Sequence, residues 1–275
     1  MGKGPGIFSD IGKKAKDLLT KDYFQDQKLV ITTETDCGLI FTTSSLKKKD
    51  LLTGDILTQF KNKNVTAEVK VDTNSSLTTT ITVDELVRGL KTVLNATVPE
   101  PAGKLEFQYR HEHAGICSTI GLTAVPVVEV NAAFGAEAFA FGGEVAFDTG
   151  SGAFTKYNAG IGVTKPDFCA ALLLADKAEV VKVSCLYNVN NETKTTVAGE
   201  VLHRFPTRDT TVTVGASYAL DKLTTVKTRL NNHGKLGALL QHEIRPKSTI
   251  TISTEVDTKA LDKDPKVGLA LALKP

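Results

Sequence analysis

The feature that most constrains the fold of this chain is a strict alternation of apolar and polar residues that recurs along most of its length. In residues 103–110, GKLEFQYR, the apolar Leu105, Phe107 and Tyr109 alternate with charged or polar residues. In an extended strand successive side chains point to opposite faces, so one face is apolar and the other polar. The same pattern returns in residues 65–71, 181–187, 226–231 and 250–256. The sequence therefore predicts an all-β fold built from many two-faced strands.

The turns between these strands favour a transmembrane barrel over a soluble sandwich. Turn-forming residues gather at 61–64 (KNKN), 72–76 (DTNSS), 148–152 (DTGSG) and 231–235 (NNHGK). The best-marked turns lie about a dozen residues apart, which suits tilted membrane strands of ~9–11 residues with short connections. A sandwich would contain more aromatic residues to fill its core. A soluble all-β ligand-binding protein stays open as the alternative, and the turns are poorly marked between Ala114 and Phe147.

Composition limits the classes of function. The 275 residues contain 33 Lys and Arg against 31 Asp and Glu, a formal net charge of +2. This balance gives no indication of a sequence-specific nucleic-acid binder. Trp is absent, and the many Gly and Thr residues favour strands and turns over helices. No stretch has the composition of an interdomain linker, so we expect one large all-β unit.

Signals for export, metal binding and catalysis are weak. The opening residues MGKGPGIFSDIGKK contain no apolar stretch of the kind found in a secretory signal. Cys37, Cys117, Cys169 and Cys185 form no metal-ligand spacing, and we expect free thiols. His111 and His113 could share one strand face, but no third ligand is nearby. No nucleophile motif is present either. We predict that the protein is not an enzyme and has no cofactor and no metal site.

The first residues differ in kind from the rest. Ile7, Ile11, Ala15 and Leu18 recur at helical intervals, and the lysines fall largely on the other sides. Ser9 or Asp10 can cap the start of this helix. The sequence predicts an amphipathic helix, either on a surface or against the barrel wall with its lysines facing the lumen.

From Tyr218 the sequence is YALDKLTTVKTRLNNHGKLGALL, and this stretch resembles the signature of the eukaryotic porins. The triplet GLK at Gly89–Lys91 and the ending KVGLALALKP agree with the same family. The resemblance extends over nearly the whole chain and is closest to the voltage-dependent anion-selective channels of plant mitochondria. The family has a Gly-rich hinge after the helix in many animal members, whereas this chain has LLTKDYFQDQ there.

The resemblance implies a fold and a function. The fold is a barrel of 19 strands with the helix in its lumen. An odd number of strands joined by hairpins makes the first and last strands parallel, so we expect the strand near residues 29–35 to pair with residues 267–273. Residues 1–25 are expected to form the helical segment and residues 26–275 the barrel. The implied function is a voltage-dependent, weakly anion-selective channel of the mitochondrial outer membrane, through which metabolites, nucleotides and ions diffuse.

The site residues follow from the resemblance and from the alternation. In the family, helix lysines and the GLK triplet contact nucleotides, which implies contacts at Lys13, Lys14, Lys16, Lys21, Gly89, Leu90 and Lys91. Alternation places four further positive charges in the lumen, namely Arg110, Lys182, Lys227 and Arg229. The family's sorting signal for mitochondrial barrel proteins fits Lys266, Gly268, Leu271 and Leu273. The implied partners are ATP, ADP and other small anions in transit, membrane lipid, the mitochondrial barrel-assembly machinery, hexokinase and further copies of the chain.

Overall fold

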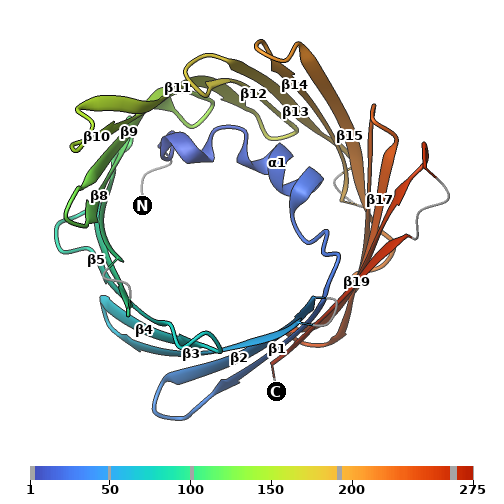
Figure 1. The fold of residues 1–275 in the computed structure, drawn as a ribbon. Coiled ribbons are helices and arrows are strands. Elements are labelled where there is room, and N and C mark those ends of the chain that lie inside the picture. Colours follow the sequence, from blue (N-terminus) through green and yellow to red (C-terminus); the bar gives the residue numbers. More distant parts are fainter. Residues whose placement is uncertain (1–3, 49–50, 100–101, 191–193, 261–264, 275) are drawn as a thin grey trace.

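The computed structural model describes residues 4–48, 51–99, 102–190, 194–260 and 265–274. Within this part of the chain, nineteen strands form a single sheet (Figure 1). Residues 1–3 of the expected helical segment and residue 275 of the expected barrel lie outside the described residues. The strands are β1 Gln27–Glu34, β2 Leu39–Lys48, β3 Leu51–Asn62, β4 Val65–Asp72, β5 Leu77–Asp84, β6 Leu90–Val98, β7 Ala102–Arg110, β8 Ala114–Leu122, β9 Val127–Ala136, β10 Phe139–Asp148, β11 Ala153–Thr164, β12 Phe168–Ala175, β13 Val180–Asn190, β14 Thr195–Arg204, β15 Asp209–Ala219, β16 Thr224–Asn231, β17 Lys235–Arg245, β18 Ser248–Asp257 and β19 Lys266–Leu273.

The sheet closes on itself. Each strand pairs antiparallel with the next along the chain, and β1 pairs with β19 in parallel. In this closing pair Gln27 lies opposite Leu269 and Ile31 opposite Leu273. The prediction of 19 strands with a parallel first and last pair is therefore confirmed. Closure gives β1 and β19 a hydrogen-bonded neighbour on both sides, which removes the exposed edges that an open sheet presents.

Turn chemistry between the strands follows the sequence. At the β4–β5 turn the carboxylate of Asp72 accepts hydrogen bonds from the backbone N–H groups of Asn74 at 2.8 Å and Ser76 at 3.1 Å. At the β10–β11 turn the carboxylate of Asp148 accepts from the N–H of Gly150 at 2.9 Å. Such side-chain bonds satisfy turn N–H groups that have no strand partner. The weakly marked stretch from Ala114 to Phe147 also folds into strands, β8, β9 and most of β10.

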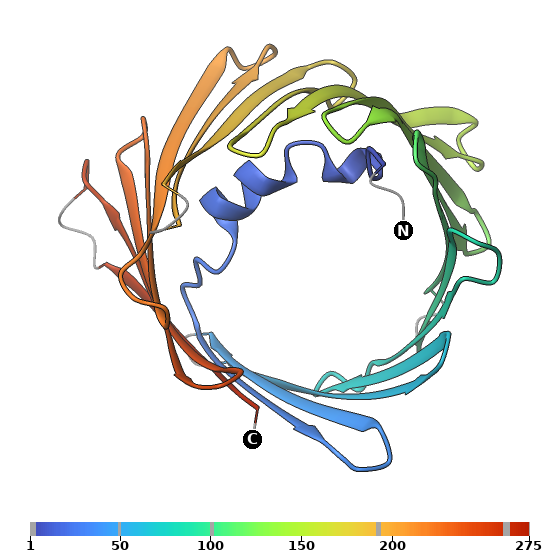
Figure 2. The same ribbon diagram turned by 180° about the vertical axis from the view of Figure 1, so that it is seen from behind.

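The chain before β1 lies inside the barrel (Figures 1 and 2). We call residues 4–26 the N-terminal segment. It contains a short 3₁₀ turn, Phe8–Asp10, and the helix α1, Lys13–Thr20. None of the helices in the described residues is long and apolar enough to cross a membrane.

The expected helix is interrupted. Gly12 adopts the left-handed conformation with φ 75°, which separates the 3₁₀ turn from α1. Ser9 and Asp10 therefore do not cap α1, whose N-cap residue is Gly12 and carries no side-chain hydrogen bond. The Asp10 carboxylate instead accepts the backbone N–H of Ile7 at 3.1 Å and holds the first turn. The break changes the direction of the chain, so that it can follow the curved wall.

Candidate functional site in the lumen

The two faces of the wall can be assigned from the N-terminal segment. Side chains directly opposite in paired strands lie on the same face, so a contact with the segment on one strand fixes the inner face of its neighbours. A Cβ atom at Gly115 would overlap the backbone of the segment at Gly6, so Gly115 faces the lumen. Arg110 pairs with Gly115 and therefore shares this inner face. Lys104, Glu106 and Gln108 follow by alternation on β7.

The outer wall is apolar. On β7 the outward Phe107 and Tyr109 are each 38% exposed, and on β4 Val65, Val69 and Val71 are also exposed. These side chains would be unfavourable in contact with water over so large a continuous area, and they fit contact with lipid. The polar face of residues 103–110 consequently points into the lumen.

The N-terminal segment is held to the inner wall by apolar contacts. Phe8 and Ile11 pack with Ala133 and Ala171 of the wall. Further along, Ala15, Leu18 and Leu19 pack with Leu186 and Ala198. Leu19 is 1% exposed, although it lies inside a wide barrel. The inner wall is therefore apolar where the segment rests on it.

Polar contacts hold the end of the segment. The Arg229 guanidinium donates hydrogen bonds to the backbone carbonyl of Leu19 at 2.9 Å and to the Glu255 carboxylate at 2.7 Å. It also lies 4.2 Å from the centre of the Tyr23 ring, within the range of a cation–π interaction. The Lys227 ammonium lies 3.4 Å from the Asp22 carboxylate.

A glycine makes the Arg229 contact possible. Gly237 on β17 pairs with Arg229 on one side and with Glu255 on the other. Because Gly237 has no side chain, the arginine reaches across β17 to the carboxylate on β18. The burial of Tyr23 raises its pKa to about 12, and the nearby Arg229 charge opposes this shift.

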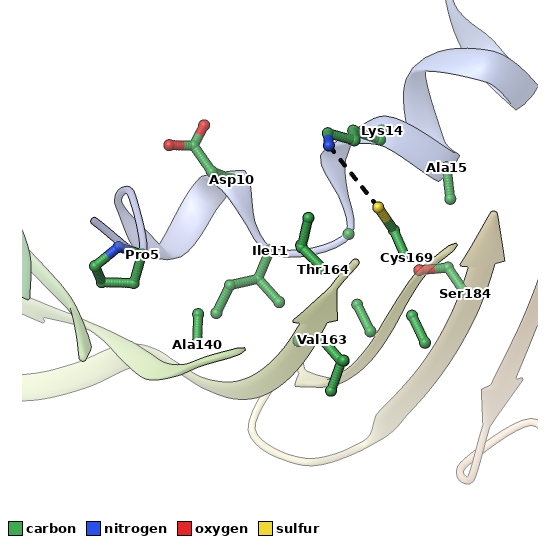
Figure 3. A pocket seen from close by; sticks show the side chains of 14 residues that line it. Pro5, Asp10, Ile11, Lys14, Ala15, Ala140, Val163, Thr164, Cys169 and Ser184 are labelled. Atoms are coloured by element: carbon green, nitrogen blue, oxygen red, sulfur yellow. Dashed lines mark hydrogen bonds between the residues drawn. The ribbon is translucent and has the colours of Figure 1, made fainter. Parts of the chain in front are cut away.

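The lysines of α1 face different surroundings. The Lys13 ammonium lies 3.5 Å from the Asp10 carboxylate, and the Lys14 ammonium lies 3.8 Å from the Cys169 sulfur. Lys16 and Lys21 are exposed, and among the described residues neither forms an ion pair. Figure 3 shows Lys14 and Cys169 at the edge of a pocket of about 70 Å³ between the segment and strands β10–β13.

The triplet at Gly89 lies elsewhere on the wall. Gly89 has φ 84° in the turn before β6, and its carbonyl accepts the N–H of Arg110 at 2.9 Å. Leu90 begins β6, and the Lys91 ammonium lies 3.8 Å from the Asp84 carboxylate. Since α1 packs on β13–β16, the structure does not bring the triplet and the helix lysines together (Figure 1).

The other predicted lumen cations and the predicted sorting-signal residues lie on the barrel wall. The Lys182 ammonium lies 2.8 Å from the Glu200 carboxylate, with side chains 20% and 14% exposed. The Arg110 side chain has no ion-pair partner among the described residues. On β19 the inward side contains Lys266 and Gly268, and the outward side contains Leu271 and Leu273, as the pairing with β18 requires.

Sequence reasoning missed three residues whose side chains contact Arg229 or Lys227, namely Glu255, Asp22 and Tyr23. Alternation alone could have placed Glu255 in the lumen, because Glu255 and Ser253 share the polar face of residues 250–256. The structure shows that this face is the inner one, since the Ser253 hydroxyl donates to the Phe24 carbonyl. Asp22 and Tyr23 follow α1 and carry no periodic signal. Their roles depend on the path of the segment across the lumen.

The geometry defines the class of protein. A closed barrel with an apolar outer wall and a wide, charged interior is a transmembrane diffusion pore. In the residues that the structure describes, no cluster of three or more His, Cys, Asp or Glu side chains could hold a metal ion.

Comparison with known proteins identifies the family. Residues 4–268 match the eukaryotic porin family. The chain is 54% identical over 276 aligned positions to the mitochondrial outer membrane protein porin of 34 kDa from Solanum tuberosum, with 100% of both chains covered. It is 49% identical to mitochondrial outer membrane protein porin 2 of Arabidopsis thaliana and 51% identical to an outer plastidial membrane protein porin of Pisum sativum, again with 100% of both chains covered.

The chain therefore belongs to the eukaryotic porin family. It is a channel of the mitochondrial outer membrane and not an enzyme, and metabolites cross the membrane through it. The soluble ligand-binding alternative is wrong, because the family and the closed barrel both define a membrane pore.

Proposed function

We propose that this channel is voltage-dependent and weakly anion-selective, and that ATP, ADP and other small anions are among the solutes that cross it. The observation that carries the proposal is the set of lumen cations without a carboxylate partner. Lys16 and Lys21 are exposed in the lumen, and Arg110 shares the inner face of β7. A positive charge that is not neutralised locally lowers the energy of a passing anion, and its long side chain still lets the anion leave.

The preference is weak because several other lumen cations are paired with carboxylates. Lys70 lies 3.6 Å from Asp55, and Lys156 lies 2.9 Å from Glu144. Paired charges cancel at distances longer than their separation, and salt screens what remains beyond about 8 Å in physiological solution. A wide pore whose positive charge is partly neutralised in this way therefore favours anions without excluding cations.

The experiment is the reversal potential of the refolded protein in a planar bilayer under a salt gradient. We expect a modest preference for anions that decreases in the double variant Lys16→Glu, Lys21→Glu. Lys222→Glu is the control, since it makes the same charge change as either single substitution but in the β15–β16 turn and not in the N-terminal segment. An unchanged reversal potential in the double variant contradicts the assigned role of these lysines.

The triplet Gly89, Leu90 and Lys91 and the helix lysines Lys13 and Lys14 are proposed as nucleotide contacts on the family resemblance. Because the triplet and α1 lie on different parts of the wall, one nucleotide would meet them in succession. Added ATP should lower the small-ion conductance of the wild type, and Lys91→Gln should weaken that effect. If ATP lowers the conductance of Lys91→Gln as much as that of the wild type, the triplet is not a nucleotide contact.

We also infer that residues 1–25 and 26–275 act as a lumen element and a barrel. Lys266, Gly268, Leu271 and Leu273 are proposed to direct assembly by the mitochondrial machinery, since β19 is the strand that closes the barrel. Gly268→Asp should then fail to assemble in isolated mitochondria, and normal insertion would contradict this role. The resemblance supports hexokinase and further copies of the chain as partners.

A further inference from the structure

A row of inward-facing glycines lies beneath the N-terminal segment. The row begins on β8 and continues around the wall to β19, in the same order as the segment itself. In each case a Cβ atom added to the glycine would meet an atom of the segment within 4 Å. The glycines are Gly115 on β8, Gly160 and Gly162 on β11, Gly215 on β15, Gly237 on β17 and Gly268 on β19.

The contacts are tightest at the two ends of the row. A Cβ atom at Gly115 would overlap the carbonyl oxygen of Gly6, and one at Gly268 would overlap the carbonyl oxygen of Phe24. Both overlaps are with backbone, which cannot turn aside as a side chain can. The segment therefore approaches the wall more closely than any residue with a side chain would allow.

Side chains of the segment fill the space over the middle of the row. A Cβ atom at Gly162 would lie 3.1 Å from Cγ2 of Ile11, and one at Gly215 would lie 2.6 Å from Cδ2 of Leu19. At Gly237 the added atom would lie 3.3 Å from the Tyr23 ring and 2.9 Å from Nε of Arg229. These are the same side chains that hold the segment to the wall.

Backbone conformation does not explain these glycines. None of the six has a φ in the left-handed region, so another residue could adopt the same backbone. Glycine inside a strand costs roughly 0.5–1 kcal/mol relative to alanine and often marks the close approach of another backbone. An inward glycine away from the segment behaves differently. A Cβ atom at Gly121 on β8 would meet nothing closer than 3.5 Å, and nothing from the segment.

We propose that this row is a docking track that fixes the N-terminal segment on the inner wall and thereby sets the free cross-section of the pore. The six glycines are positioning residues, because they act through the segment and not on the solute. The proposal goes beyond anion selectivity and does not depend on it. It also gives Gly268 a role separate from the predicted sorting signal.

The test uses a native thiol beside the segment. Cys169 is partly buried under α1, and its sulfur lies 3.8 Å from the Lys14 ammonium. The exposed Cys37 in the β1–β2 turn serves as an internal reference. A hydrogen bond with the Thr35 hydroxyl lowers the pKa of Cys37, which keeps this reference reactive. Labelling by a maleimide, followed by peptide mass spectrometry, gives the rate at Cys169 relative to Cys37.

Gly162→Ala is the main variant, because its added methyl meets Ile11 and comes no closer than 3.7 Å to the wall atoms within reach. We expect the relative labelling rate of Cys169 to rise at least about fivefold, which corresponds to about 1 kcal/mol of lost docking. Gly121→Ala is the matched control and should leave the rate unchanged. Ile11→Ala removes the side-chain atom that the added methyl crowds. The increase in Cys169 labelling caused by Ile11→Ala should therefore be smaller in the Gly162→Ala variant than in the wild type.

A second variant separates docking from sorting. Gly268→Ala is refolded in detergent, where no assembly machinery is present, and hydrogen exchange is measured in residues 21–26. We expect faster exchange there than in the wild type. Unchanged labelling in Gly162→Ala together with unchanged exchange in Gly268→Ala overturns the proposal. So does an equal rise in labelling in Gly121→Ala, because it would show a general effect of alanine in the wall.

Discussion

Replacing Arg229 with alanine should release the end of the N-terminal segment from the wall. The guanidinium makes a hydrogen bond to the Leu19 carbonyl, an ion pair with Glu255 and a cation–π contact with Tyr23. A hydrogen bond to a charged group contributes ~1.5–3 kcal/mol and a cation–π contact ~0.5–2 kcal/mol. The Arg229 and Glu255 side chains are 23% and 17% exposed, so water offsets part of this sum. We expect a loss of about 3 kcal/mol, or about 150-fold in the docking equilibrium.

The assay is hydrogen exchange of the peptide that contains α1, followed by mass spectrometry on protein in detergent micelles. Amides of α1 exchange when the helix leaves the wall and unwinds, so the exchange rate reports the docked fraction. An eight-residue helix is not stable alone in water, which couples undocking to unwinding. Arg229→Ala should therefore speed the exchange of α1 by about 150-fold.

Two further variants make the result interpretable. Arg229→Lys keeps the charge but loses the planar fork, so its exchange should fall between the wild type and Arg229→Ala. Arg110→Ala removes the same charge from the lumen at a side chain that forms no hydrogen bond or ion pair with the described residues of the segment. Wild-type exchange in Arg229→Ala, or equally fast exchange in Arg110→Ala, would refute the assignment of Arg229 as the residue that holds the segment.

Two other substitutions test the lumen contacts. The pKa of Tyr23 is raised from 10.0 to about 12 by burial, so the undocked state loses its proton first as the pH rises. The docking that Tyr23 supports is complete below pH 10 and declines between pH 10 and 12. Tyr23→Phe should abolish this decline in exchange measurements, with little cost at pH 7 because the Tyr23 hydroxyl has no hydrogen-bond partner among the described residues. Lys182→Met leaves the Glu200 carboxylate without its cation and should destabilise the barrel by about 2 kcal/mol, after allowance for partial exposure, in thermal unfolding. The double variant Lys182→Met, Glu200→Gln should recover most of the loss; equal destabilisation in both would contradict the pair's role.

Much of the wall could be predicted from alternation, because a strand with one wet and one lipid face repeats every two residues. The two faces of β7 are of this kind, whereas the pairing of β1 with β19 is predicted from the odd number of strands that the family resemblance implies. The strand count needed the family resemblance, since turns alone do not distinguish an odd number from an even one.

The weak strand pattern between Ala114 and Phe147 has a physical explanation. Between Ala114 and Phe147 the inner face carries many small residues, among them Gly115, Ala133 and Ala140, so the contrast between the two faces is weaker than elsewhere. Ala133 is 0% exposed and packs with Phe8 and Ile11 of the N-terminal segment. The signal is therefore weak in one part of the wall that the segment covers.

The contacts of the segment could not be predicted, because they join residues about 200 positions apart with no shared periodicity. Arg229 and Leu19 are 210 residues apart, and Lys227 and Asp22 are 205 apart. Alternation gave these two cations an inward direction, but it could not show that carboxylates from the segment and from β18 lie beside them.

The contacts of Arg229 with the segment and with β18 change what a charge reversal at this position measures. A glutamate at position 229 would face Glu255 and lose the bond to the Leu19 carbonyl, so it would undock the segment as well as change the field of the pore. A lower anion preference in that variant would have two causes that a reversal potential cannot separate. Lys16 and Lys21 avoid this problem, since both are exposed and their side chains form no ion pair within the part of the chain that the structure describes. Selectivity and docking thus depend on different cations, and each has variants that leave the other unchanged.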